Sequence, residues 1–222
     1  MSLRNDPGGD YYKTNYRSYR DQNPEHKLDH YVSVIERTLP STEAPTLLDI
    51  GCALGTFLDH TASRRPHWTL YGTDIRPDAI EIASGILQGR ARLETAPAET
   101  RPFGDMAFDV ITAWDVLEHL ADPAETVSNL RAWLKPGGVL VFVVPVYDGI
   151  TGPIVTILDK DPTHLQKRSR DFWVDLASSQ LSRVSWHGIL RYLLPGRRYL
   201  HIPTRTGRRF TPAILVVAHR DD

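Results

Sequence analysis

The sequence predicts an α/β fold built on a mainly parallel sheet. Between about residues 45 and 187, short aliphatic or β-branched segments alternate with longer segments of helical periodicity, which is the pattern of βαβ units. Of the 222 residues, 41% are hydrophobic and 24% are charged, so the chain can bury a core of its own. We therefore expect a single domain in three parts: an N-terminal lid or helix over 1–40, a core over 45–187, and an Arg-rich insertion with the last strand over 188–222.

Charge and cysteine content exclude several classes of protein. Lys and Arg total 26 against 27 Asp and Glu, so the net charge of −1 provides no overall field that would attract nucleic acid or an anionic membrane. Cys52 is the single cysteine, which excludes an internal disulfide. No signal-peptide pattern is present, and the longest apolar run, Val139 to Val144, is too short to span a membrane. We expect a soluble, cytoplasmic protein with no membrane partner.

The boundaries of the expected elements have local causes. A first helix is predicted over about 24–39, because Asn23-Pro24 resembles a helix cap and apolar residues then recur at helical spacing. A helix over about 123–134 begins after Asp122 and ends before Gly137-Gly138. Further helices are predicted at about 55–64, 78–87 and 169–179. The predicted strands are Thr46–Ile50, Thr69–Thr73, Ala91–Glu94, Phe108–Ala113, Val139–Val144, Arg183–Trp186 and Ala213–Ala218.

The turn after the first strand has the composition of a ligand-binding loop. Gly51 and Gly55 flank it, and glycine lets the backbone approach a ligand more closely than a side chain would allow. Asp74 ends the second strand, where a carboxylate can accept hydrogen bonds from two ribose hydroxyls. Ala53 and Thr56 stand where the dinucleotide fingerprint needs glycine, so a dinucleotide is disfavoured. The pattern indicates a nucleoside site at the carboxyl ends of the strands.

Three segments in order carry a family pattern. The turn matches Asp-x-Gly-x-Gly-x-Gly at Asp49, Gly51 and Gly55, with Ala53 in place of the middle glycine. Residues 103–123 contain a Phe-Asp stretch and Leu-Glu-His, and residues 130–145 contain Leu-Lys-Pro-Gly-Gly before a strand. In these segments the sequence resembles the class I S-adenosylmethionine-dependent methyltransferases. The resemblance implies a Rossmann-like fold with a seven-stranded, mostly parallel sheet, helices on both faces, and S-adenosylmethionine as cofactor, converted to S-adenosylhomocysteine.

The resemblance also implies roles for single residues. The Gly51–Gly55 loop would pass under the methionine part of the cofactor, Asp74 would bind the ribose, and Ile75 would lie against the adenine. Many members hold the adenine amino group with an Asp-Ala pair. Pro97-Ala98 stands there in this chain, so Glu99 or backbone groups would substitute. The expected cofactor-binding residues are Asp49, Gly51, Cys52, Ala53, Gly55, Asp74, Ile75, Ala98, Glu99 and Trp114.

Two histidines are candidates for catalysis. His164 follows the fifth strand, where family members often place a histidine that faces the acceptor. His119 follows the fourth strand beside Glu118, and a purely structural role for this pair is an equal alternative. A hydroxyl acceptor would need a general base, for which histidine is suited, whereas an unprotonated amine would need less help. Asp159 and Asp161 near His164 are typical of turn chemistry, so we expect no metal.

The two ends of the chain contain residues that could cover the cofactor and bind the methyl acceptor. Five of the nine tyrosines lie near the N-terminus, where they would form either a lid over the cofactor or a surface arm: Tyr11, Tyr12, Tyr16, Tyr19 and Tyr31. Residues 188–210 contain six arginines and neither Asp nor Glu: Arg191, Arg197, Arg198, Arg205, Arg208 and Arg209. Arginine suits phosphate and carboxylate groups, so this segment predicts an anionic acceptor or a carrier-protein partner. A solvated basic hairpin is the alternative.

These patterns favour a methyltransferase that acts on a small or carrier-bound, anionic acceptor. Three alternatives stay open. One is an enzyme that uses the sulfonium of the cofactor for something other than methylation. A non-catalytic partner subunit would bind S-adenosylmethionine without turnover. A nucleic-acid methyltransferase would use the Arg-rich segment, but the Asp/Asn-Pro-Pro-aromatic motif of amine-methylating DNA enzymes is absent after the fourth strand, where Asp115-Val116-Leu117-Glu118 stands.

Overall fold

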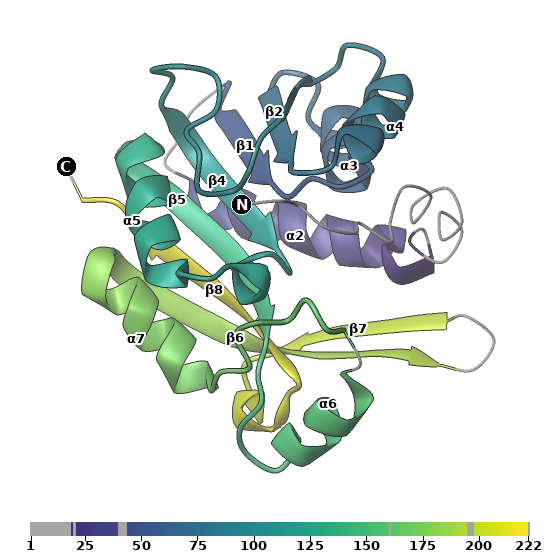
Figure 1. Ribbon diagram of the computed structural model, residues 1–222, viewed down its shortest axis with the longest axis vertical. Coiled ribbons are helices and arrows are strands. Elements are labelled where there is room, and N and C mark those ends of the chain that lie inside the picture. The colour runs from purple at the N-terminus through teal and green to yellow at the C-terminus, as the bar shows by residue number, and fades with distance from the viewer. Residues whose placement is uncertain (1–18, 20, 40–43, 160, 195–197, 222) are drawn as a thin grey trace, which may run out of the picture.

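The computed structural model describes residues 19, 21–39, 44–159, 161–194 and 198–221 (Figure 1). Its described residues form one eight-stranded sheet in the order β3-β2-β1-β4-β5-β8-β6-β7. The strands are β1 (Thr46–Ile50), β2 (Thr69–Asp74), β3 (Arg92–Thr95), β4 (Phe108–Trp114), β5 (Leu134–Pro145), β6 (Ser182–Leu194), β7 (Arg198–Thr204) and β8 (Ala213–His219). The helices are α2 (Glu25–Thr38), α3 (Thr56–Arg64), α4 (Pro77–Leu87), α5 (Pro123–Trp133), α6 (Gly152–Leu158) and α7 (Arg170–Gln180).

The sheet is parallel over its first five strands and antiparallel over the rest. β3, β2, β1, β4 and β5 pair in parallel, β8 runs antiparallel between β5 and β6, and β7 pairs antiparallel with β6. The predicted α/β fold with a mostly parallel sheet is therefore confirmed. The predicted number of seven strands is wrong, because the Arg-rich segment continues β6 to Leu194 and returns as β7.

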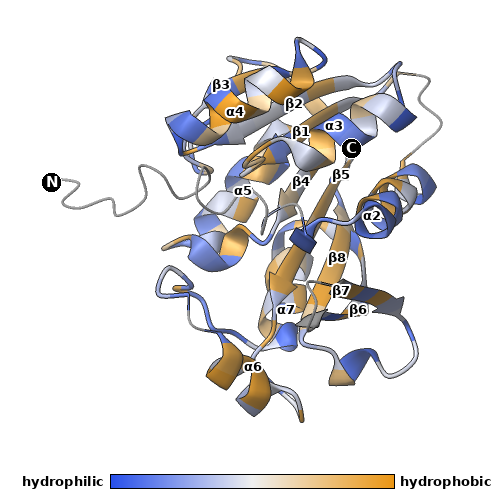
Figure 2. Cartoon of the chain, turned by 90° about the vertical axis from the view of Figure 1, so that its right-hand side faces the viewer, coloured by the Kyte–Doolittle hydropathy of each residue, from blue (hydrophilic) through white to orange (hydrophobic). Residues whose placement is uncertain are grey.

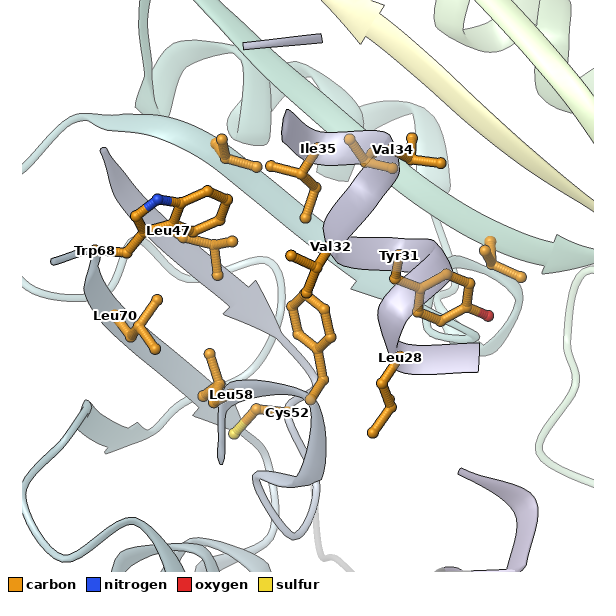
Figure 3. Packing of buried hydrophobic residues seen from close by; sticks show 14 of the residues in the cluster. Leu28, Tyr31, Val32, Val34, Ile35, Leu47, Cys52, Leu58, Trp68 and Leu70 are labelled. Atoms are coloured by element: carbon orange, nitrogen blue, oxygen red, sulfur yellow. The ribbon is translucent and has the colours of Figure 1, made fainter. Parts of the chain in front are cut away.

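Two apolar cores lie on opposite faces of the sheet. Leu47 belongs to the core that α2, α3 and α4 cover, and its neighbour Leu48 belongs to the core under α5 and α7. This alternation follows from the two-residue period of a strand. Figure 3 shows side chains of α2, such as Val32 and Ile35, turned toward the strand residue Leu47. The expectation of helices on both faces is confirmed.

The α6 helix was not predicted, and it follows the carboxyl end of β5. It is short and mostly apolar (Figure 2). Val155 and Leu158 line the cavity described below, whereas Ile154 and Ile157 face solvent. We conclude that α6 serves as part of the cavity wall.

No helix in the described part of the chain combines the length and the apolar character that a membrane span requires.

Three histidines connect α2 to the β6–β7 hairpin. His30 Nδ1 lies 2.9 Å from His201 Nε2, and His30 Nε2 lies 3.2 Å from His187 Nε2. Burial, together with neighbouring positive charge, lowers the pKa of His30 to about 4, that of His187 to about 4 and that of His201 to about 2. The three rings are therefore neutral at pH 7, and this chain of hydrogen bonds depends on their neutrality.

Acid is expected to destabilise this contact. In the unfolded chain these histidines take up protons as the pH falls below about 6.5, whereas in the folded protein they resist protonation until about pH 4. Between these two pH values the unfolded state therefore binds more protons than the folded state. The free energy of unfolding consequently decreases as the pH is lowered, by up to about 1.4 kcal/mol per histidine and pH unit. Thermal unfolding measured at several pH values should show this loss of stability. In His187→Asn, stability should fall less steeply with decreasing pH than in wild type. The control His67→Gln changes an exposed histidine and should keep the wild-type dependence of stability on pH. If His187→Asn also kept the wild-type dependence, this account would be contradicted.

Candidate active site

A cavity of about 1060 Å³ lies at the carboxyl ends of β1, β2, β4 and β5. This is where parallel α/β sheets bind their ligands. Eleven of the twelve predicted site residues line it: Asp49, Gly51, Cys52, Ala53, Asp74, Ile75, Ala98, Glu99, Trp114, His119 and His164. The twelfth, Gly55, does not line the cavity. It caps α3 with a φ of +70°, and a Cβ there would lie 2.9 Å from Leu87, so Gly55 lets α3 and α4 pack closely.

The loop after β1 bends sharply under this cavity. Gly51 has a φ of +68°, and a Cβ on it would lie 2.5 Å from Val116 Cγ2. Ala53, which stands where the family motif has glycine, also has a positive φ of 48°. The Cys52 amide donates to the Thr73 carbonyl at 2.8 Å, which ties the loop to β2. Burial raises the pKa of the Cys52 thiol, in keeping with a packing role for this side chain.

Asp74 joins the end of β2 to the same loop. Its Oδ2 accepts from the Ala53 amide at 2.9 Å, and its Oδ1 accepts from the Arg76 amide at 2.9 Å. The residue is 7% exposed, and burial raises the pKa of its carboxyl group although the two amide hydrogen bonds oppose this. Each carboxylate oxygen has a further acceptor position. Asp74 can therefore hold the loop and still accept hydrogen bonds from two hydroxyls of a ligand.

Asp49 lies beneath the loop and is 1% exposed. Thr112 Oγ1 donates to its Oδ1 at 2.6 Å. Burial, with a smaller contribution from the Asp74 charge, raises the pKa of Asp49 to about 8. Near pH 7 this carboxyl group is therefore largely protonated, and it places a polar but uncharged group against the cavity.

Aromatic rings form one wall of the cavity. Tyr31 of α2 stacks on Trp114 at the end of β4, with ring centroids 4.0 Å apart and planes 9° apart. Trp114 Nε1 is buried and has no hydrogen-bond partner among the described residues. Tyr19 also lines the cavity. The remaining three tyrosines of the predicted lid, Tyr11, Tyr12 and Tyr16, lie outside the described residues.

Charged residues that were not singled out as site residues line the opposite end of the cavity. Arg191 of β6 forms an ion pair with Asp115 after β4, its Nη1 lying 2.6 Å from the carboxylate. Burial acts to raise the pKa of Asp115, but the charges of Arg191 and Lys27 outweigh it and hold the pKa below its usual value. Burial lowers the pKa of Lys27 of α2 to about 8, so its ammonium stays mostly charged at pH 7. Tyr199 of β7 lies with its ring 5.1 Å from Lys27 Nζ.

The Arg-rich segment contributes less to the cavity than predicted. Of its described arginine side chains, Arg191 lines the cavity, whereas Arg205, Arg208 and Arg209 are exposed and do not. Arg208 stacks on Trp186 instead, with the guanidinium carbon 4.0 Å from the ring centroid. Arg197 and the side chain of Arg198 lie outside the described residues.

The two candidate histidines lie side by side, with ring centroids 4.6 Å apart. His164 Nδ1 lies 2.9 Å from Asp159 Oδ1 and 3.1 Å from the Tyr147 hydroxyl. His119 Nδ1 lies 2.9 Å from Thr163 Oγ1. Burial and the nearby His164 lower the pKa of His119. Both rings thus have their Nδ1 side engaged by the protein, and Nε2 of His164 lies 4.0 Å from Asp161 Oδ2.

Comparison with known proteins identifies the family. A family profile described as a methyltransferase domain matches residues 16–191, well over half of the chain. The chain belongs to this methyltransferase family. The resemblance seen in the sequence to class I S-adenosylmethionine-dependent methyltransferases is confirmed, and S-adenosylmethionine is the cofactor of the family.

Individual relatives of this methyltransferase differ in acceptor. It is 30% identical over 105 residues to a malonyl-(acyl-carrier protein) O-methyltransferase of Halalkalibacterium halodurans, covering 45% of this chain and 39% of the relative. It is 30% identical over 132 residues to a ubiquinone biosynthesis O-methyltransferase of Paraburkholderia xenovorans, covering 55% of each. The chain thus spans less than two thirds of the length of either relative. The plantazolicin methyltransferase BpumL, solved in complex with SAH, shares the fold with a TM-score of 0.71 at 16% identity, covering 97% of this chain and 91% of that one.

Proposed function

We propose that this protein transfers a methyl group from S-adenosylmethionine to a small or carrier-bound acceptor that carries negative charge. The observation that carries the proposal is a cavity lined by two different groups of side chains, which the strand order sets apart because β1, β4, β5 and β8 lie between β2 and β6. One end is built from the Gly51 loop and Asp74, and the other from Lys27, Arg191 and the two histidines. The first end suits a nucleoside and the second an anionic molecule.

The Gly51 end fits the cofactor by three features. Gly51 lines the cavity and has no side chain, so a ligand can approach its backbone closely, while Val116 fills the space on the side where a Cβ would lie. The Asp74 carboxylate can bind two vicinal ribose hydroxyls, and the buried Trp114 Nε1 offers an unpaired donor. Ala98 and Glu99 line the cavity near the expected adenine position, whereas Ile75 is 68% exposed at its edge. When bound, S-adenosylmethionine supplies a methyl group on a positively charged sulfur.

Electrostatics at the other end support an anionic acceptor. Lys27 and Arg191 carry two positive charges, and Asp115 offsets one of them. Asp159 and Asp161 also line the cavity beside His164 and are negatively charged, and Lys167 pairs with Asp159. The excess of positive charge is therefore confined to the group of Lys27, Arg191 and Asp115, where we place the anionic part of the acceptor. Burial and the nearby Asp115 raise the pKa of Glu118 well above its usual range, so Glu118 does not cancel the remaining positive charge as long as it holds a proton. The relative from Halalkalibacterium halodurans is named for a malonyl group on an acyl-carrier protein, which is a carrier-bound acceptor with a carboxyl group.

The chain's own residues would align the acceptor and handle its proton. As the new bond to the methyl carbon forms and the sulfur-carbon bond breaks, a hydroxyl acceptor must lose its proton. His164 is our first choice for the base, because Asp159 and Tyr147 orient its ring. His119, oriented by Thr163, is the second. Either ring can also hold the acceptor oxygen in place.

Labelled methyl transfer tests the proposal. The protein would be incubated with S-adenosylmethionine labelled in the methyl group and, in separate reactions, malonyl-(acyl-carrier protein), free malonate and a broad metabolite extract. We expect label in an acidic product. Docking of a carrier should weaken steeply with salt, because the Debye length falls from about 10 Å at 0.1 M to about 3 Å at 1 M. Cofactor binding without transfer to any acceptor would favour the non-catalytic partner subunit, and label in nucleic acid would favour the nucleic-acid methyltransferase.

Arg191 provides the sharpest test of acceptor charge. Once an acceptor is known, Arg191→Gln should raise its Michaelis constant at least about tenfold, because a charged hydrogen bond contributes roughly 1.5 to 3 kcal/mol. Arg191→Lys should lie between this variant and wild type, since lysine keeps the charge but loses the guanidinium fork. The control Arg209→Ala, outside the cavity, should behave as wild type. Equal Michaelis constants in wild type and Arg191→Gln would remove Arg191 from the acceptor site.

A further inference from the structure

A three-residue cluster at the acceptor end of the cavity has the composition of a metal site. Glu118, His119 and His164 each offer one ligand atom, and these atoms lie within 4.8 Å of one another. Glu118 and His119 belong to the short helical turn Leu117–His119 after β4, and His164 belongs to the segment between α6 and α7. Two elements far apart in the sequence thus bring one carboxylate and two imidazoles together.

Glu118 is the unusual member of the cluster. Its side chain is completely buried, and neither carboxylate oxygen has a hydrogen-bond partner among the described residues. A buried carboxyl group in this state costs free energy unless a proton or a cation compensates it. Its main chain is held, since the Glu118 carbonyl accepts from the Gln166 amide at 2.9 Å. The turn that carries Glu118 is therefore tied to the segment that carries His164, while both side-chain oxygens of Glu118 lack a hydrogen-bond partner among the described residues.

Both histidines are oriented as metal ligands are. Asp159 lies against His164 Nδ1 at 2.9 Å, and Thr163 lies against His119 Nδ1 at 2.9 Å. In metal sites the non-ligating nitrogen of histidine is held in this way by a carboxylate, a hydroxyl or a carbonyl, which fixes the ring and its tautomer. Asp159 is itself held by the Tyr147 hydroxyl at 2.6 Å and by Lys167 Nζ at 3.0 Å. A second layer of support thus exists behind the cluster.

We propose that Glu118, His119 and His164 bind one divalent transition-metal ion. Two imidazoles and one carboxylate suit Zn²⁺ or Mn²⁺, whereas an all-oxygen site would suit Mg²⁺ or Ca²⁺. Three protein ligands leave a coordination position open, and because the cluster lines the cavity an acceptor oxygen can occupy it and lose its proton more readily. With the ion bound, the two histidines would act as its ligands, and the ion would replace them in promoting loss of the acceptor's proton. The proposed role of the ion in catalysis rests on the proposed function, but its binding does not. The proposal departs from our expectation of no metal, which considered Asp159 and Asp161 as ligands rather than Glu118.

Direct titration tests the site without reference to activity. The full-length protein would be stripped with a chelator, and Zn²⁺ binding would be followed by calorimetry and Mn²⁺ binding by electron paramagnetic resonance. We expect one ion per chain, with at least about tenfold weaker binding in Glu118→Gln and in His164→Asn. Asp159→Asn should weaken binding by about 10- to 100-fold, because it removes the group behind His164. His187→Asn, in the separate histidine cluster, should bind as wild type.

Each outcome decides the inference. Thermal unfolding of Glu118→Gln would show whether the variant folds, and His164→Asn offers an independent removal of a ligand. Absence of stoichiometric binding in wild type, or equal affinity in wild type, Glu118→Gln and His164→Asn, would overturn the metal site. Methyl transfer that persists in the chelated protein would leave the proposed function standing without the ion. Metal binding in a protein that binds no S-adenosylhomocysteine would instead reject the proposed function and keep the site.

Discussion

Replacement of Asp74 with alanine is expected to weaken the binding of S-adenosylhomocysteine by at least about tenfold. Two ribose hydroxyls would lose a charged acceptor, and each such hydrogen bond contributes roughly 1.5 to 3 kcal/mol. The same change removes the acceptor of the Ala53 and Arg76 amides, so the loop after β1 would also lose its anchor to β2.

The Asp74 experiment is a calorimetric titration of wild type and variants. Asp74→Asn keeps the size of the side chain and removes its charge, but its amide nitrogen cannot accept from one of the Ala53 and Arg76 backbone amides. Thermal unfolding of both Asp74 variants would therefore report how far the loop is disturbed. The control Asp105→Ala changes an exposed carboxylate outside the cavity and should leave affinity unchanged. Affinity for S-adenosylhomocysteine that is the same in Asp74→Ala and wild type would show that the cofactor does not bind at the end of β2.

Replacement of His164 with alanine is expected to lower turnover by about 10²-fold or more, while affinity for S-adenosylhomocysteine stays nearly constant. The reason is position: His164 lies at the acceptor end, away from Asp74, and Asp159 and Tyr147 hold its ring. His119→Ala should also reduce turnover, by a smaller factor, because its ring lies 4.6 Å from that of His164.

Single-turnover measurements with saturating acceptor would isolate the transfer step. Asp159→Asn should shift the pH profile of turnover, since it changes the group behind His164, and a residue of merely structural importance would not move that profile. Full turnover in the double variant His119→Ala with His164→Ala would mean that neither histidine takes part in the reaction.

The cofactor end of the site could be predicted because its signals are local. The β1 strand spans Thr46–Ile50 as predicted, Gly51 follows it directly, and Asp74 is the last residue of β2. In a parallel sheet the ends of neighbouring strands meet at one edge, so sequence order alone brings these residues together. Ala53 stands where the family has glycine, yet its φ of 48° keeps the bend of the loop.

The acceptor end depends on contacts between distant segments, which spacing does not reveal. Asp115 and Arg191 are 76 residues apart, and they meet because β6 runs on to Leu194 past the end of β4. Lys27 joins them from α2, whose position depends on the histidine contacts with the β6–β7 hairpin. A turn signal at Pro195-Gly196 between two runs of strand-forming residues would have indicated the extra hairpin.

The most direct test of the central claim is a calorimetric titration of the wild-type protein with S-adenosylhomocysteine, with NADH as the comparison ligand. We propose that Asp74 binds the single ribose of the cofactor, and the loop after β1 lacks the dinucleotide glycine pattern. We predict one S-adenosylhomocysteine bound per chain and no detectable binding of NADH. Absence of S-adenosylhomocysteine binding up to about 1 mM, or equal affinity for NADH, would contradict the assignment of this protein as an S-adenosylmethionine-dependent methyltransferase.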